Sequence, residues 1–217
     1  MAWATATLLA FGLWLVFTAP PDFQQGVTVR IMYVHVPSAK MSLLIYLLLT
    51  LVSLLFLWKG YDWADRLSEA ATPVGAAFAA VTLVTGSIWG KPMWGAWWAW
   101  DARLTSMLVL LVLYVGLIAL RSAFDDARRG ARSTAVMVLV GAVDLPIIHY
   151  SVQWWRTLHQ PASFNGPTSA IAAPLLWPLL VMSVAFLALA CYMVLLKFRL
   201  VTVQRQLEEK LEQVEAS

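Results

Sequence analysis

The chain has 217 residues, of which 61% are hydrophobic and only 12% are charged, and its mean hydropathy is +0.73. A soluble domain carries about 25% charged residues, so this composition excludes an ordinary soluble protein and predicts a polytopic membrane protein. The net charge is +3, but the basic residues lie in short connections and a tail, which argues against nucleic acid as a partner. With a single cysteine, Cys191, the chain has no internal disulfide and no CxxC or CxxCH motif.

Six apolar runs are long enough to cross a bilayer, where every backbone polar group must be satisfied within a helix. We expect helices near residues 3–20, 35–58, 70–90, 104–121, 134–150 and 173–197. The first run lacks a basic start and a compact cleavage site, so an uncleaved helix is expected rather than a signal peptide. In the third run, Gly75 with Ala79 and Ala76 with Ala80 predict close approach of a neighbouring helix. The predicted fold class is all-α, with residues 1–197 as one transmembrane domain of six helices.

Residues 198–217 differ in pattern from these spans. Leu200, Val203, Leu207, Leu211 and Val214 follow a spacing of three and four, with charged residues between them. This pattern predicts an amphipathic cytoplasmic tail that pairs with a partner or lies on membrane lipid. A solvated helical continuation of the sixth span fits the pattern equally well.

The lysines and arginines predict the orientation in the membrane. With both termini in the cytoplasm, ten of the fifteen fall on the inner side and five on the outer side, as the positive-inside rule favours. The outer segments are then residues 20–34, 90–103 and 151–172. All three histidines and seven of the twelve tryptophans lie in or beside them.

The densest group of tryptophans lies between the third and fourth spans, at about residues 89–106. Gly90, Pro92 and Gly95 are expected to break the incoming helix. Beyond them, Trp94, Trp97, Trp98, Trp100 and Asp101 follow helical spacing, which predicts a short helix with an aromatic face. An interfacial aromatic belt explains single tryptophans, but five within twelve residues favour a platform for a flat apolar ligand.

The histidines point to the identity of that ligand. His35 lies at the outer mouth of the second span and His159 in the third outer segment. One imidazole on each side of a tryptophan platform suits the two axial positions of a haem iron. Zinc fits less well, because it normally requires three or four converging ligands. His149 has apolar neighbours, which favour packing or support of a ligand.

Haem also carries two propionates, which outer cations would pair with. The candidates from the sequence are Arg30, Lys40, Lys91, Arg103 and Arg156, and arginine can bind a carboxylate bidentately. Each of them is also explained as an interface anchor. Asp144, inside the fifth span and two residues before Pro146, is expected to accept hydrogen bonds from backbone that the proline disturbs, or else to serve a function.

Several stretches together resemble the CcmC family, the haem exporter C proteins of bacterial cytochrome c maturation. Trp94–Asp101 is similar to the "WWD" motif of haem-handling membrane proteins. The similarity extends from about residue 27 to 161 and is also carried by Tyr33–Pro37, Thr85–Pro92, Trp100–Ser106 and Leu145–Trp155.

The resemblance implies six transmembrane helices in the bacterial inner membrane, both termini in the cytoplasm, and haem b held at the periplasmic face. It implies one axial histidine from the first outer segment and one from the third, which here are His35 and His159. It also implies delivery of haem to the chaperone CcmE, in a complex with CcmA, CcmB and CcmD. The chain would then be a haem-handling protein and not an enzyme.

Two other functions fit the sequence less well. A b-type electron-transfer subunit usually has its histidines within the spans, whereas those of this chain lie at one edge. A haem pore would need a polar path through the spans, and the sequence offers little besides Asp144.

Overall fold

The computed structural model describes residues 1–159, 164–165, 168–169 and 171–215. The described chain is almost entirely helical, which confirms the all-α prediction. Its elements are α1 (Ala2–Thr18), the 3-10 helix η1 (Val27–Ile31), α2 (Met32–Lys59), α3 (Asp62–Trp94), α4 (Ala102–Ser122), α5 (Ala127–Gly141), α6 (Asp144–Trp154), the two-residue antiparallel strands β1 (Phe164–Asn165) and β2 (Thr168–Ser169), and α7 (Ala173–Glu215).

Among the described residues, five helical stretches are long and apolar enough to cross a membrane, namely Val27–Lys59, Asp62–Trp94, Ala102–Ser122, Ala127–Trp154 and Ala173–Val214. They confirm a polytopic membrane protein. The predicted first span is also a helix, but α1 has only 17 residues, which is about 26 Å at 1.5 Å per residue. That is somewhat shorter than the hydrocarbon core of about 30 Å.

The fifth predicted span is broken into α5 and α6 at Ala142–Val143. Pro146 has no N–H to donate to the carbonyl four residues earlier, that of Ala142, and its ring crowds that carbonyl. Asp144 is buried, and its side chain does not cap α6. Among the described residues its Oδ2 has no hydrogen-bond partner, so the expected bonds from disturbed backbone to this oxygen are not seen.

Close packing joins α3, α4 and α2. A Cβ atom on Gly75 would overlap the ring of Tyr114, so α4 approaches the backbone of α3 directly. This confirms the small-residue prediction at Gly75. The Tyr114 hydroxyl donates a hydrogen bond to the carbonyl of Ser42 at 2.7 Å, which ties α4 to α2 in the core.

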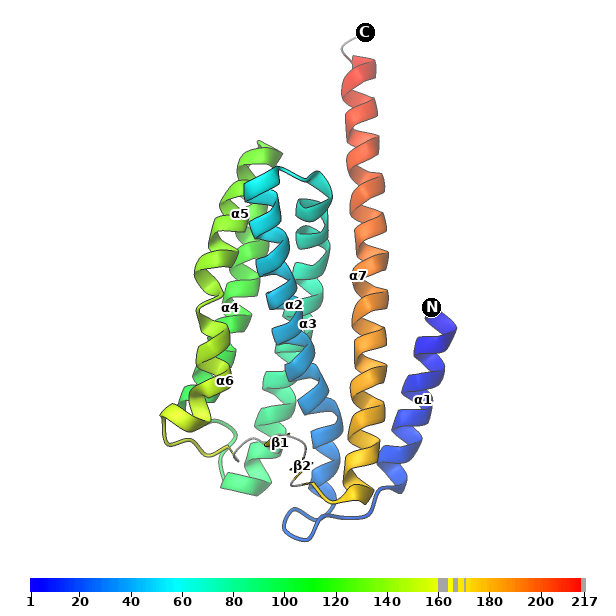
Figure 1. Cartoon of the computed structure of the whole chain (residues 1–217), viewed down its shortest axis with the longest axis vertical. Coiled ribbons are helices and arrows are strands. Elements are labelled where there is room, and N and C mark those ends of the chain that lie inside the picture. The colour runs from blue at the N-terminus through cyan, green and yellow to red at the C-terminus, as the bar shows by residue number, and fades with distance from the viewer. Residues whose placement is uncertain (160–163, 166–167, 170, 216–217) are drawn as a thin grey trace.

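The loops that connect α1 to α2, α3 to α4 and α6 to α7 lie at one end of the molecule, which we call the loop end (Figure 1). The sequence prediction that these three segments share one side is therefore confirmed, as far as they are described. The α2–α3 and α4–α5 connections lie at the opposite end.

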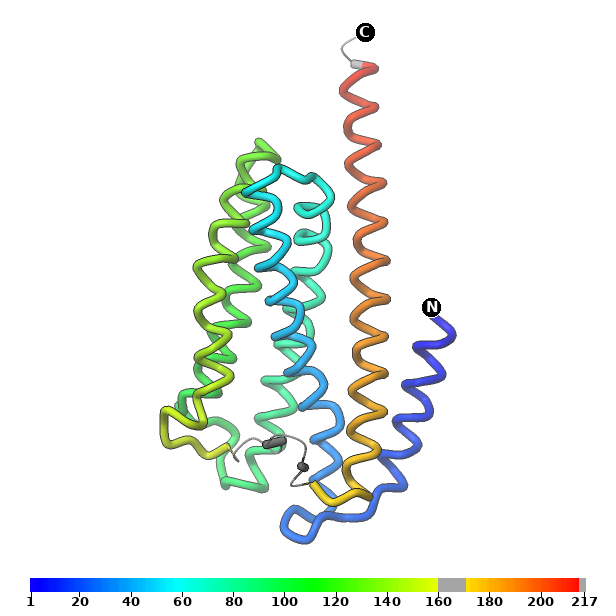
Figure 2. Tube along the Cα trace, viewed as in Figure 1, coloured from blue at the N-terminus to red at the C-terminus, as the bar shows by residue number. Residues whose placement is uncertain are grey.

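The tail does not form a separate helix. α7 continues without interruption to Glu215 and projects beyond the other helices (Figure 2). Its extension is anchored where Arg205 pairs with Asp65 at 2.8 Å and with Glu69, beside Arg121 of α4, which also pairs with Asp65 at 2.8 Å. The sequence allowed either a separate amphipathic helix or a helical continuation of the sixth span, and the backbone is the continuation.

Candidate functional site

His35 lies near the start of α2, with its ring packed against α3. Its Nδ1 is 3.0 Å from the carbonyl oxygen of Thr82 and 3.1 Å from the hydroxyl of Thr85. The Thr85 hydroxyl donates to the carbonyl of Val81 at 2.7 Å, so both oxygens face the imidazole as acceptors. Nδ1 therefore carries the proton, and Nε2 keeps its lone pair for a ligand.

Small and aromatic neighbours fix the orientation of this ring. A Cβ atom on Gly86 would lie 3.0 Å from Cε1 of His35, so glycine leaves the space that the ring needs. The Trp89 ring stands nearly perpendicular to the imidazole, with centroids 5.6 Å apart. The indole N–H of Trp89 in turn donates to the side chain of Gln25 at 3.0 Å.

His159 is held in a similar way by a carboxylate. Its Nδ1 lies 3.3 Å from Oδ2 of Asp101, and its ring meets the edge of Trp94 with centroids 5.0 Å apart. A carboxylate bound to Nδ1–H leaves Nε2 as the basic nitrogen, as in carboxylate–histidine–metal arrangements. Burial lowers the pKa of the His159 imidazole below its ordinary value, more than Asp101 raises it.

Asp101 joins two parts of the loop end. Its Oδ1 accepts the backbone N–H of Leu104 at 2.8 Å and so caps α4. Its Oδ2 accepts the backbone N–H of Leu158 at 3.2 Å, beside the contact to His159. The last residue of the WWD motif therefore fixes both the start of α4 and the segment that carries His159.

The tryptophan segment does not form the predicted short helix. α3 continues through Gly90 and Pro92 to Trp94 and ends at Gly95, whose φ of 79° lies in the left-handed region. Because Gly95 ends α3 and Asp101 caps α4, only residues 96–100 remain between the two helix caps, and their backbone is irregular. The expected helix break at Gly90 and Pro92 is wrong, and that at Gly95 is correct.

The tryptophans differ in exposure. Trp97 is 57% exposed and Trp100 is 77% exposed. Trp98 is partly buried against the edge of Trp100, with centroids 5.4 Å apart. Its indole N–H is buried and has no hydrogen-bond partner among the described residues. The segment thus offers exposed ring faces and one unsatisfied donor.

The candidate cations fall into different surroundings. Arg30 donates to the carbonyl of Phe17 at 3.0 Å, at the end of α1, and Lys91 donates to the carbonyl of Gly95 at 3.0 Å. Arg103 donates to the hydroxyl of Ser151 at 3.3 Å, which links α4 to α6. Arg156 is exposed.

His35 and His159 come from segments far apart in the sequence but lie in one electrostatic neighbourhood. A charge on His159 acts on His35, and the guanidinium of Arg103 acts on both imidazoles. Within the described residues, no partner is seen for Nε2 of either ring. Imidazoles without a described partner at Nε2 and exposed indole faces are the kinds of group that haem binding requires.

His149 does not belong to this cluster. It is exposed on α6, and its ring contacts that of Tyr150, with centroids 4.7 Å apart. The prediction that it packs among apolar neighbours holds only in part, because the imidazole faces outward.

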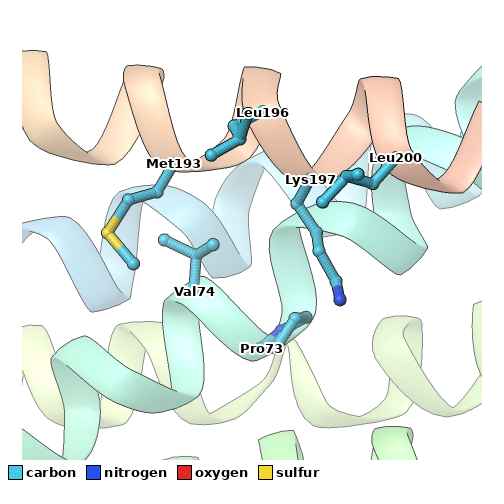
Figure 3. Close-up of a pocket in the computed structure, with 6 residues that line it drawn as sticks. All are labelled: Pro73, Val74, Met193, Leu196, Lys197 and Leu200. Carbon is cyan, nitrogen blue, oxygen red and sulfur yellow. The ribbon is translucent and has the colours of Figure 1, made fainter. Parts of the chain in front are cut away.

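A separate groove lies between α3 and α7 (Figure 3). Val74 and Pro73 form one side, and Met193, Leu196, Lys197 and Leu200 form the other. The α3 side includes Pro73, whose ring interrupts the hydrogen bonding of α3. The groove is lined almost entirely by aliphatic side chains and contains none of the candidate site residues.

Comparison with known proteins decides the family. A family profile described as "Heme exporter protein C" (CcmC) matches residues 1–213. The chain belongs to the CcmC family. This confirms the resemblance and the prediction of a haem-handling membrane protein of cytochrome c biogenesis that is not an enzyme.

Relatives from distant organisms support this membership. The chain is 51% identical to "Heme exporter protein C" of Bradyrhizobium diazoefficiens over 187 residues, which cover 86% of this chain and 71% of the relative. It is 46% identical to the Escherichia coli K12 protein of the same name over 202 residues, 92% of this chain and 81% of that one. A "Putative cytochrome c biosynthesis ccmC-like mitochondrial protein" of Marchantia polymorpha is 40% identical over 195 residues, 90% and 82% of the two chains.

Sequence reasoning missed the residues that support the histidines. Asp101 precedes an apolar helix, a pattern typical of a helix N-cap, so its capping role was detectable. Its contact with His159 was not, because 58 residues separate the two. The contacts of His35 with Thr82 and Thr85 depend on how α2 packs on α3, which no local pattern indicates.

Proposed function

We propose that this CcmC-family chain holds haem b at the loop end, with His35 and His159 as the two axial ligands, and delivers it to the chaperone CcmE. The observation that carries this proposal is that the two imidazoles have the same pattern of contacts. In each ring Nδ1 is engaged by oxygen, from Thr82 and Thr85 in one case and Asp101 in the other. Each Nε2 is left to bind iron.

The tryptophan segment would support the porphyrin. An exposed indole covers a large apolar area with little loss of conformational freedom, and Trp97 and Trp100 present such faces. The same faces are accessible to another protein. We infer that haem rests against these rings while one edge of the porphyrin stays open to the chaperone.

Among the cations, Arg103 is the strongest candidate to balance the propionates. It is held by Ser151 and lies where its charge acts on both histidines. Arg156 is the exposed candidate and would reach a propionate from the rim. Arg30 and Lys91 already donate to backbone carbonyls, so they would have to exchange partners.

We further infer the membrane arrangement. With α1 as a sixth crossing, the loop end faces the periplasm of a bacterial inner membrane and both termini lie in the cytoplasm. Residues 198–217, at the far end of α7, would then face the cytoplasm. CcmA, CcmB and CcmD are the expected neighbours in a CcmABCD complex.

The ligation scheme is tested by absorption spectroscopy of purified full-length protein. His35→Ala and His159→Ala should each lose most of the haem that co-purifies with the wild type, because each removes one iron ligand. His149→Ala, a histidine outside the cluster, is the matched control and should hold the wild-type amount of haem once it is saturated with added haem. Full retention of haem by both single variants would rule out the scheme.

A further inference from the structure

A groove of about 290 Å³ lies between α2 and α6. Its walls are three leucines of α2 and a short apolar and aromatic stretch of α6, and they include Leu43, Leu44, Leu47, Pro146, His149 and Tyr150. The leucines lie about 12 to 18 Å beyond His35 along the helix axis. The groove therefore lies below the loop end, along the apolar stretch of α2 that is long enough to cross a membrane.

The unexpected residue in this groove is His149. Its imidazole is exposed on a surface that otherwise presents aliphatic and aromatic side chains to the bilayer. Within the described part of the chain, neither ring nitrogen has a hydrogen-bond partner, and the one ring contact is to Tyr150. An unsatisfied polar side chain facing hydrocarbon is costly, and such residues commonly mark a ligand path.

Aromatic rings continue from His149 toward the loop end. Tyr150 stacks on Trp154 with centroids 5.3 Å apart and an angle of 23° between the planes. Trp154 meets Trp155 at 5.7 Å. These rings are exposed, and they end four residues before His159 in the sequence.

We propose that this groove is a lateral loading site, where haem enters from the bilayer and its iron binds His149 before reaching His35 and His159. This inference rests on the proposed function. A porphyrin is flat and apolar enough to enter from lipid, imidazole is a ligand for its iron, and the aromatic rings offer faces to stack on. A phospholipid chain would need the leucines but not the histidine.

The elements beside the groove support this route. The helices that line the groove also carry the proposed ligands, since α2 contains His35 and α6 leads along the chain to His159. α6 is a helix separate from α5, with the break at Ala142–Val143 between them. On its other side, Arg103 is bound to Ser151 and joins α6 to the histidine cluster.

The test measures how fast haem loads from lipid. Full-length protein without haem is placed in nanodiscs, ferric haem is added in donor lipid vesicles, and the Soret absorption is followed in time. Leu47→Trp, which fills the groove, and His149→Leu, which removes the nitrogen, should each slow loading by about tenfold. Both should reach the wild-type final spectrum, because His35 and His159 are unchanged.

Leu54→Trp is the matched control, since Leu54 is an exposed leucine of α2 outside the groove. It should load at the wild-type rate. A wild-type loading rate in either Leu47→Trp or His149→Leu would overturn the proposal. If only His149→Leu loads at the wild-type rate, the groove matters but its histidine does not, which would indicate that a lipid chain occupies it. A failure of the proposed axial ligation would give a different result, because variants that lack His35 or His159 would then retain haem at equilibrium.

Discussion

At the residue scale, the carboxylate of Asp101 has two roles, because it caps α4 and also contacts the candidate ligand His159. Asp101→Ala removes the cap of α4, at a cost of about 1 kcal/mol, and frees the ring of His159. Loss of such a supporting carboxylate typically weakens metal binding by about 10–100-fold. Titration of purified protein with haem should show a weaker affinity in this range.

The matched control for this variant is Asp126→Ala. Asp126 also caps a helix, accepting the backbone N–H groups of Arg128 and Arg129 at 2.8 and 3.0 Å, but it lies at the opposite end of the molecule. It should lose similar stability and keep wild-type haem affinity. Equal losses of affinity in both variants would show that Asp101 acts through the fold alone.

The pKa of His159 gives a pH prediction at the same scale. Burial holds this pKa below its ordinary value, which is about 6.5, and iron binds only the neutral ring. The ligand should therefore stay neutral as the pH falls through that value, and haem release should begin only in more acidic solution.

This prediction is checked by following the Soret band of the loaded protein during acid titration. A release midpoint above about pH 6.5 would contradict the assigned cause.

At the element scale, Gly75 sets how closely α3 and α4 pack. Gly75→Ala would place a methyl group against the ring of Tyr114, which is fully buried and cannot move aside. Such overpacking costs about 1–3 kcal/mol, so the midpoint of thermal unfolding in detergent should fall.

Gly116→Ala provides the comparison for that measurement. Its Cβ atom would lie 3.2 Å from the terminal methyl group of Met137, and methionine rotates away easily. Its unfolding midpoint should stay close to that of the wild type. A larger loss in Gly116→Ala than in Gly75→Ala would contradict this account of the helix contact.

The helices themselves were largely predictable, because hydrophobic length is a strong signal in a membrane protein. The sequence analysis did not predict the break between α5 and α6. Pro146 disturbs the carbonyl four residues before it, so the helix breaks at Ala142–Val143 and not at the proline itself. The tryptophan segment was predicted with the wrong local structure. The helical spacing of its tryptophans does not produce a helix, because α3 ends at Gly95 and Asp101 starts α4 only six residues later.

At the scale of the whole molecule, the sequence predicted that three segments meet at one end but not which side chains touch there. The same holds at the other end, where Asp65 meets Arg121 and Arg205, which are 56 and 140 residues away in sequence. Contacts of this kind depend on how the helices pack, and one sequence carries no direct record of that. The family motifs, in contrast, gave the candidate haem ligands without any structure.

The proposed orientation makes a prediction for intact cells. In a Cys191→Ser background, Phe23→Cys places a thiol on the fully exposed loop between α1 and α2. A thiol reagent that cannot cross the membrane should label it in spheroplasts. Glu212→Cys, on the extension of α7, should be labelled only after the membrane is opened. The reverse pattern would mean that the loop end faces the cytoplasm.

The central claim is that two imidazoles from distant segments hold one iron, and electron paramagnetic resonance of ferric haem in the full-length protein tests it most directly. We expect a low-spin, bis-imidazole signal in the wild type. When excess ferric haem is added, the haem that binds to His35→Gly or His159→Gly should be high-spin and should return to low-spin when free imidazole is added. A wild-type signal that is high-spin, or one that stays low-spin in both variants without added imidazole, would contradict the account.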